Sequence, residues 1–269
     1  MSFLPHYGDI IERKKAQRRR AQQDKCMEAL RSNPGNYASW YELGRCMNSL
    51  DVVDVDGQRY TQQECFAEAL RIYPDDFDSW VHLGECINFQ RSAAVNGKEY
   101  NRQQCYVEAL RVDPSSSVTW HVLGDYVALN QIVTVNGKEY TKLQCYVQAL
   151  SIDPSLIHAW CSLGELVAPK ELVILGGKQY SAQECFLEAY CCEPDDLFVR
   201  IKLESTMQRG DIVSVMNSSR GSHLFLALDE HGHPGRIPAS QDPTPTLHKQ
   251  QHHVTNVAVY PPLHEWFFP

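Results

Sequence analysis

The stretch that decides the fold is PSSSVTWHVLGDYVALNQIVTVNGKEYTKLQCYVQALSID, which occupies residues 114–153. Several of its positions recur every 40 residues along the chain. They hold a tryptophan, a leucine followed by a glycine, and a proline: Trp40, Trp80, Trp120, Trp160; Leu43, Leu83, Leu123, Leu163; Gly44, Gly84, Gly124, Gly164; and Pro34, Pro74, Pro114, Pro154, Pro194. A period of roughly 20–50 residues is typical of a solenoid, a propeller or another repeat array.

Each repeat is expected to open with a helix, here called helix A. After the proline comes a small polar step such as Asp75-Asp76, which suits a helix N-cap. The pattern Trp-x-x-Leu-Gly-x-x-apolar follows, and its spacings of three and four place the apolar members on one stripe of a helix. This pattern predicts helix A over residues 76–89 in the second repeat.

A short alternating apolar segment follows helix A and runs into a turn sequence. The turn dipeptides are Asp56-Gly57, Asn96-Gly97, Asn136-Gly137 and Gly176-Gly177. Type I′ hairpin turns prefer such pairs because both central residues need a positive φ. We therefore expect a small β-hairpin in each repeat, with an irregular loop as the alternative. The hairpins are expected to pack on adjacent helices for stability, and a docking ridge is the alternative.

A second helix, helix B, begins after the hairpin. Thr61-Gln-Gln-Glu64 and its counterparts have the pattern of capping boxes, and the helix ends before the next proline. A lone helix over residues 20–32 precedes the repeats, and a last helix A over residues 196–208 carries Arg200 in place of tryptophan. Both have the character of end caps, because no single repeat can bury its apolar stripe alone.

These residues resemble the tetratricopeptide repeat family. Trp-x-x-Leu-Gly matches the opening motif of the family, and Phe66, Ala69 and Pro74 match its close. The resemblance covers roughly residues 22–209, and the hairpin adds six residues to the usual unit of 34. It implies a mainly α fold, a right-handed α-solenoid of helix–hairpin–helix repeats. One departure lies early in helix B, where the family has a small residue: this chain has Gln62, Arg102 and Lys142 there, and only Ala182 fits.

The resemblance also implies binding of other proteins in a groove lined by the A helices. Carrying over the inward positions gives a candidate set: Tyr41, Arg45, Asp78, Val81, Glu85, Asn88, Val118, His121, Asp125, His158, Cys161 and Glu165. The carboxylates of Glu85, Asp125 and Glu165 form one row that would attract a basic peptide or tail. A solvated helix face without a ligand is the alternative. The resemblance implies that members of the family that bind chaperones hold an acidic C-terminal tail with Lys, Asn and Arg side chains. Such a clamp is not expected here, because the matching positions hold other residues: Glu42, His82, Val122 and Ser162.

The formal net charge of −8 excludes a generally basic protein that coats nucleic acid. Residues 1–20 nevertheless hold six basic and two acidic residues, and we treat them as a basic N-terminal arm. Residues 13–20 could be a nuclear localisation signal, a nucleic-acid contact or a solvated helical lead-in. No aromatic residue is interleaved there for base stacking, so nucleic acid is not expected as a partner except through this segment.

Residues 210–269 change in character after the repeats, which occupy 21–209. Segments 211–215 and 224–228 have the pattern of strands, and the many prolines from Pro234 onward favour extended or disordered structure. The apolar end, Trp266, Phe267 and Phe268, either folds back onto the repeats or binds a partner. We therefore expect an irregular, partly stranded extension.

No catalytic constellation is evident, so we expect neither an enzyme nor a cofactor. The tail histidines match no zinc pattern, and cysteines that recur at 65, 105, 145 and 185 suggest small buried thiols. No apolar run of 18 residues occurs, so no membrane partner is expected. The expected function is a cytoplasmic, non-catalytic protein-interaction scaffold. The alternative function is that of a structural subunit of a large ribosome-like, ciliary or cytoskeletal complex, anchored by the N-terminal arm and the C-terminal tail. The alternative locations are the cytoskeleton or cilium and the nucleus.

Overall fold

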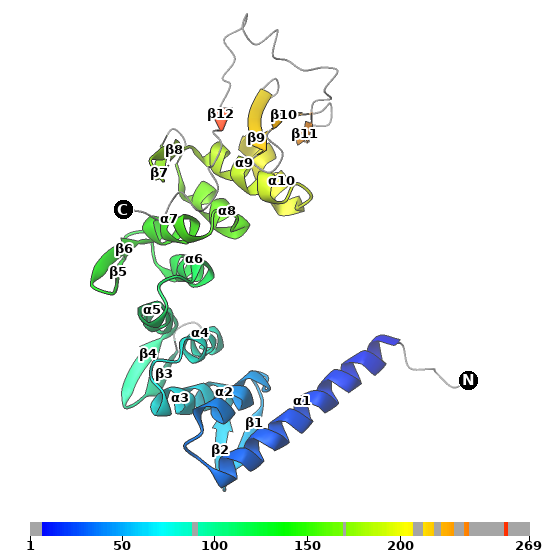
Figure 1. Ribbon diagram of the computed structural model, residues 1–269, viewed down its shortest axis with the longest axis vertical. Helices are drawn as coiled ribbons and strands as arrows, with labels where there is room; N and C mark the ends of the chain where they lie inside the picture. Colours follow the sequence, from blue (N-terminus) through cyan, green and yellow to red (C-terminus); the bar gives the residue numbers. More distant parts are fainter. Residues whose placement is uncertain are drawn as a thin grey trace, which may run out of the picture. The chain divides into compact units, whose positions relative to one another are not determined.

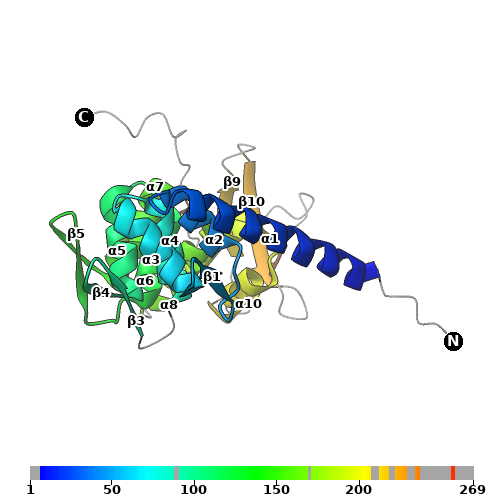
Figure 2. The same cartoon turned by 90° about the horizontal axis from the view of Figure 1, so that it is seen from below.

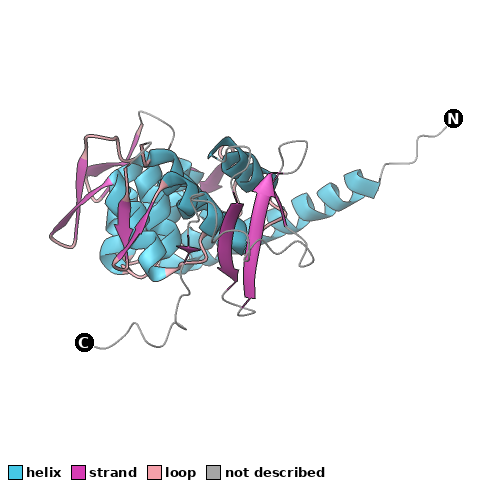
Figure 3. Cartoon of the chain, turned by 90° about the horizontal axis from the view of Figure 1, so that it is seen from above, coloured by secondary structure: helices cyan, strands magenta, loops and turns pink. Residues whose placement is uncertain are grey.

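The computed structural model describes residues 7–87, 91–168, 171–206, 212–217, 222–228, 234–236 and 256–257. Helices dominate this part of the chain, and the strands form short hairpins and one small sheet (Figure 3). The chain divides into an N-terminal unit, Met1–Lys142, and a C-terminal unit, Leu143–Pro269. We describe each unit by itself and number the repeats 1 to 4 from Pro34, Pro74, Pro114 and Pro154.

The N-terminal unit holds the first helices and three hairpins (Figure 1). Its elements are α1 (Tyr7–Ser32), α2 (Tyr37–Arg45), β1 (Val52–Val55), β2 (Gln58–Thr61), α3 (Gln62–Ile72), α4 (Phe77–Cys86), β3 (Ser92–Val95), β4 (Lys98–Asn101), α5 (Arg102–Val112), α6 (Ser117–Tyr126), β5 (Ile132–Val135) and β6 (Lys138–Thr141). Each helix from α1 to α6 contacts the next along the chain. Helices A and B thus alternate as the repeat predicts.

The C-terminal unit continues this order and ends in a small sheet. Its elements are α7 (Lys142–Ile152), α8 (Ile157–Leu166), β7 (Val173–Leu175), β8 (Lys178–Tyr180), α9 (Ala182–Cys192), α10 (Leu197–Thr206), β9 (Ile212–Asn217), β10 (Ser222–Leu228), β11 (Pro234–Arg236) and β12 (Asn256–Val257). The sheet has the order β11-β10-β9-β12, and β12 runs parallel to β9. The strand expected over 224–228 is confirmed within β10.

Two helix boundaries differ from the prediction. The lone helix expected over residues 20–32 begins at Tyr7, so the basic residues 13–20 belong to α1, as a helical lead-in would. Helix A of repeat 2 is shorter than the predicted span of 76–89. It ends at Cys86, because Ile87 adopts an extended conformation with ψ of 118°.

The repeated tryptophan joins three parts of each repeat. Its indole Nε1–H donates a hydrogen bond to the carbonyl oxygen of the proline six residues earlier, over 2.7–2.9 Å in all four repeats. Its ring lies against the tyrosine that ends the hairpin, with ring centroids 4.6–5.1 Å apart; these pairs are Trp40–Tyr60, Trp80–Tyr100, Trp120–Tyr140 and Trp160–Tyr180. The indole thus fixes the turn before helix A and the hairpin after it.

The predicted hairpins are confirmed, with the expected turns. Asn96 and Gly97 have φ of 50° and 78°, and the other three turns also have two positive φ values. The first strand packs inward against the preceding helix B, as β3 does on α3 and β5 on α5. Its inner side chains, such as Ala93 and Val95, are buried. The hairpins therefore add to the core, as expected of a stabilising role.

Helix B begins with a complete capping box in three repeats, at Thr61/Glu64, Asn101/Gln104 and Ser181/Glu184. The residue after the N-cap is the one at which the tetratricopeptide family has a small side chain. Its contacts explain why a long polar side chain stands there in repeats 1 to 3. Gln62 Nε2 donates to the carbonyl oxygens of Gly44 and Met47, at 3.1 and 3.0 Å. Arg102 donates to Ile87 O and Lys142 to Gly124 O in the same way. A long polar side chain here satisfies the last carbonyls of helix A.

The repeated glycine allows helices A and B to approach closely. A Cβ atom on Gly44 would lie 2.9 Å from the Phe66 ring, and one on Gly84 would lie 3.1 Å from the Tyr106 ring. The recurring cysteines occupy the same interface. Cys65, Cys105 and Cys185 are free, fully buried thiols, and burial raises the pKa of each to about 12. These thiols pack as small apolar groups, as expected.

Repeat 4 departs from repeats 1 and 2 at Glu188. The equivalent carboxylates, Glu68 and Glu108, bind an arginine one turn later, but Cys191 occupies that place here. Glu188 is 8% exposed, and its Oε1 lies 3.6 Å from Lys178 Nζ without a hydrogen bond among the described residues. Burial outweighs the attraction of Lys178 and raises the pKa of the Glu188 carboxyl to about 7.

Replacing Trp120 by Phe removes the hydrogen bond to Pro114 O and part of the ring contact with Tyr140. We expect the free energy of unfolding to fall by about 1–3 kcal/mol, measured by urea denaturation. Tyr140→Phe is the matched control because it keeps the ring, and its effect should stay below about 0.5 kcal/mol. Equal losses in both variants would mean that the indole makes no special contribution.

Glu188→Gln should change how stability depends on pH. The folded chain holds the Glu188 proton more tightly than the unfolded chain, so its contribution is full below about pH 4.5 and is lost as the pH rises through about 7. The variant should lack this loss. The free energy of unfolding of the variant minus that of the parent should rise by on the order of 2 kcal/mol between pH 4.5 and 8. Urea denaturation measures both values. A difference in stability between variant and parent that does not change with pH would contradict the raised pKa of the Glu188 carboxyl.

Candidate protein-binding face

The candidate groove residues lie on the side of the A helices that the tryptophan, leucine and glycine leave open. We call this side the A-helix face. In the N-terminal unit, Tyr41, Val81 and His121 are half-buried there, whereas Arg45, Asp78, Glu85, Val118 and Asp125 are exposed. In the C-terminal unit, His158 and Glu165 are exposed. Asn88 lies outside the described residues.

Within repeats 1 and 2 the candidate residues come together around an aromatic cluster. The rings of Tyr41 on α2 and His82 on α4 are 5.8 Å apart, and both lie over Phe66 of α3, at 6.0 and 5.5 Å. The guanidinium of Arg45 lies 5.6 Å from the centre of the Tyr41 ring. Two successive A helices and the B helix between them therefore form one continuous surface.

Charges around this cluster act on Tyr41. Burial raises the pKa of the Tyr41 phenol, Asp78 raises it further, and Arg45 opposes both. Asp78 is on α4, so this electrostatic contact joins successive A helices as the aromatic rings do. The structure thus brings Tyr41, Arg45 and Asp78 together.

The carboxylates of the predicted row each have a partner within their own unit. Glu85 Oε2 lies 2.8 Å from His82 Nδ1, and Asp125 Oδ1 lies 3.8 Å from His121 Nε2. In the C-terminal unit Glu165 pairs with Lys202 of α10 at 2.5 Å. These groups are solvent-exposed, where ion pairs contribute little stability, so the carboxylates can exchange their partners for a ligand's cations.

The structure corrects one candidate and adds a group that sequence reasoning missed. Cys161 is only 4% exposed, so it packs in the core and does not line the face. On α10, in contrast, Leu197, Phe198 and Ile201 are 69%, 52% and 53% exposed. Phe198 and Ile201 follow His158 and Cys161 by 40 residues, and this offset could have found them. Because Arg200 replaces the tryptophan that marks helix A, the sequence indicates only an end cap at α10.

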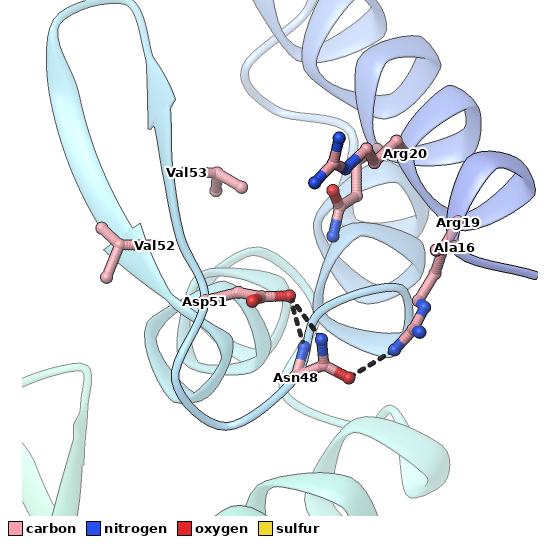
Figure 4. A pocket seen from close by; sticks show the side chains of 8 residues that line it. Ala16, Arg19, Arg20, Asn48, Asp51, Val52 and Val53 are labelled. Carbon is pink, nitrogen blue, oxygen red and sulfur yellow. Dashed lines mark hydrogen bonds between the residues drawn. The ribbon is translucent and has the colours of Figure 1, made fainter. Parts of the chain in front are cut away.

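A separate hollow of about 290 Å³ lies between α1 and the segment that joins α2 to β1 (Figure 4). Its lining residues are Ala16, Arg19, Arg20, Gln23, Asn48, Asp51, Val52 and Val53. Arg19 donates to Asn48 Oδ1, and the backbone N–H and Nδ2 of Asn48 donate to Asp51 at 2.8 and 3.0 Å. These bonds tie α1 to repeat 1, so Arg19 has a structural partner.

The described residues contain no group of three or more His, Cys, Asp or Glu side chains that could hold a metal ion. None of their helices is both long and apolar enough to cross a membrane. Trp266, Phe267 and Phe268, the candidate docking residues of the tail, lie outside the described residues.

Asp78→Asn should lower the pKa of the Tyr41 phenol, because it removes a negative charge that disfavours the phenolate. The measurement is an NMR titration of tyrosine labelled at the ring ζ carbon, with Tyr41→Phe to assign the signal. Asp54→Asn, on a hairpin away from the cluster, is the control and should leave this pKa unchanged. An unchanged pKa in Asp78→Asn would contradict the juxtaposition of α2 and α4.

The chain was compared with models of protein families and with curated proteins, and neither comparison gives a match. The likeness to the tetratricopeptide repeat therefore rests on the motifs themselves. Those motifs are Trp-x-x-Leu-Gly in helix A and the aromatic-x-x-Ala pattern of helix B, repeated in register.

Proposed function

We propose that this chain is a non-catalytic scaffold that binds other proteins along the A-helix face, and that its repeats build a right-handed α-solenoid of the tetratricopeptide type. The observation that carries the proposal is the cluster of Tyr41, His82 and Phe66, which joins successive A helices into one surface. Side chains beside it, such as Arg45 and Glu85, are exposed and take no part in the core.

The charge on this face suggests the chemistry of the partner. In the N-terminal unit, Asp78, Glu85 and Asp125 contribute three carboxylates, whereas Arg45 contributes one cation and is bound by Glu42 at 3.0 Å. An extended peptide rich in lysine or arginine complements this balance. The tyrosine, histidine and valine side chains between the charges supply apolar contact area.

Reversing two charges of the face tests this proposal. We expect a fluorescent Lys/Arg-rich peptide to bind the full chain, and Glu85→Lys with Asp125→Lys to weaken binding at least about tenfold. Glu99→Lys with Glu139→Lys is the matched control, since it makes the same charge change on exposed hairpin positions that are also 40 residues apart. Fluorescence anisotropy measures the affinities. Equal weakening by both variants, or preference for an acidic peptide, would sink the proposal.

A further inference from the structure

The segment 13–20 of α1 carries a dense and largely unneutralised positive charge. Its six cations are Arg13, Lys14, Lys15, Arg18, Arg19 and Arg20. Lys15 pairs with Glu12 at 2.9 Å, and Arg19 is held by Asn48. The other four are exposed, and from residue 10 onward no carboxylate of the described residues forms an ion pair with them. Four cations are therefore available to an external anion.

The fold presents this segment on a rod that is anchored at one end. The second half of α1 packs into repeat 1 through the buried side chains of Cys26 and Leu30, and Gln23 Nε2 donates to Cys46 O at 2.8 Å. The first half extends past α2 and β1 in two perpendicular views (Figures 1 and 2). The cations before Ala16 thus stand clear of the other elements of the N-terminal unit.

The arrangement of the charges around the helix distinguishes between kinds of anionic partner. At about 100° per residue, Arg13 lies beside Arg20, Lys14 beside Arg18, and Lys15 beside Arg19, in three directions roughly a third of a turn apart. A helix that lies on a membrane needs one apolar and one charged face. A flat acidic protein surface would engage only one of the three pairs. A partner with phosphates on two facing walls fits better.

We propose that α1 binds double-stranded DNA in the major groove, through phosphates on both walls and without reading the sequence. An α-helix with its side chains is about 10–12 Å wide, and the major groove of B-DNA is about 12 Å wide. The major groove of an RNA duplex is too narrow to admit a helix. This role does not depend on the A-helix face.

The charge of the remaining chain restricts the DNA to this helix. Residues 1–20 carry a net +4 and the whole chain −8, so residues 21–269 carry −12. This acidic body repels phosphates and disfavours contact along the repeats. The rod-like extension of α1 holds the groove away from the rest of the N-terminal unit.

The test measures binding of the full chain to a fluorescent DNA duplex of about 20 base pairs, two turns of the helix. We expect binding, and we expect the logarithm of the association constant to fall linearly with the logarithm of the salt concentration. The slope should be about −4 to −5, as four to six phosphate contacts require. Replacing Arg13, Lys14, Arg18 and Arg20 by Gln should weaken binding at least about tenfold at about 100 mM salt and make the slope shallower by about 3.5.

A matched variant controls for net charge. Replacing Arg59, Arg91, Lys98 and Lys138 by Gln removes the same charge from exposed positions at the hairpins, and binding should stay within about threefold of the parent. Circular dichroism checks that both variants keep their helices. Equal loss in both variants, absence of binding at low salt, or tighter binding of an RNA duplex or polyglutamate than of DNA would overturn the proposal.

Discussion

The buried indole of the repeated tryptophan is the interaction on which each repeat depends. Its N–H group holds the carbonyl of the proline turn, and its ring meets the tyrosine at the end of the hairpin. A buried N–H group needs such an acceptor, because leaving it unpaired is costly. One side chain thus joins the turn before helix A to the hairpin after it. The hairpin is therefore part of the core and not an appendage to it.

The sequence predicts the repeat well because its signals are local and agree with one another. The positive φ at Asn96 and Gly97 follows from the dipeptide, and the capping box at Thr61 and Glu64 follows from the spacing. The C-terminal extension is harder to predict, because β12 pairs with β9 over about forty intervening residues. The start of α1 at Tyr7 is also not evident, since a highly charged segment lacks the apolar periodicity that marks a packed helix.

The candidate face is predicted in part. The resemblance to the tetratricopeptide repeat identifies Tyr41, Arg45 and Asp78, and the structure brings these three together. It cannot foresee that Glu85 and Asp125 would meet histidines of their own helices. Nor does it foresee the exposed apolar residues of α10, because the tryptophan that marks helix A is absent there. Side-chain pairing depends on three-dimensional neighbours that a motif does not record.

The hairpins have a consequence for how the N-terminal unit folds. Each first strand packs on the preceding helix B, as β3 does on α3, only about thirty residues away along the chain. The tryptophan contacts span six and twenty residues. Such short separations give a low contact order, which favours rapid folding. In the part of the N-terminal unit that the structure describes, each helix contacts the next along the chain, so folding can begin in one repeat and spread to its neighbour.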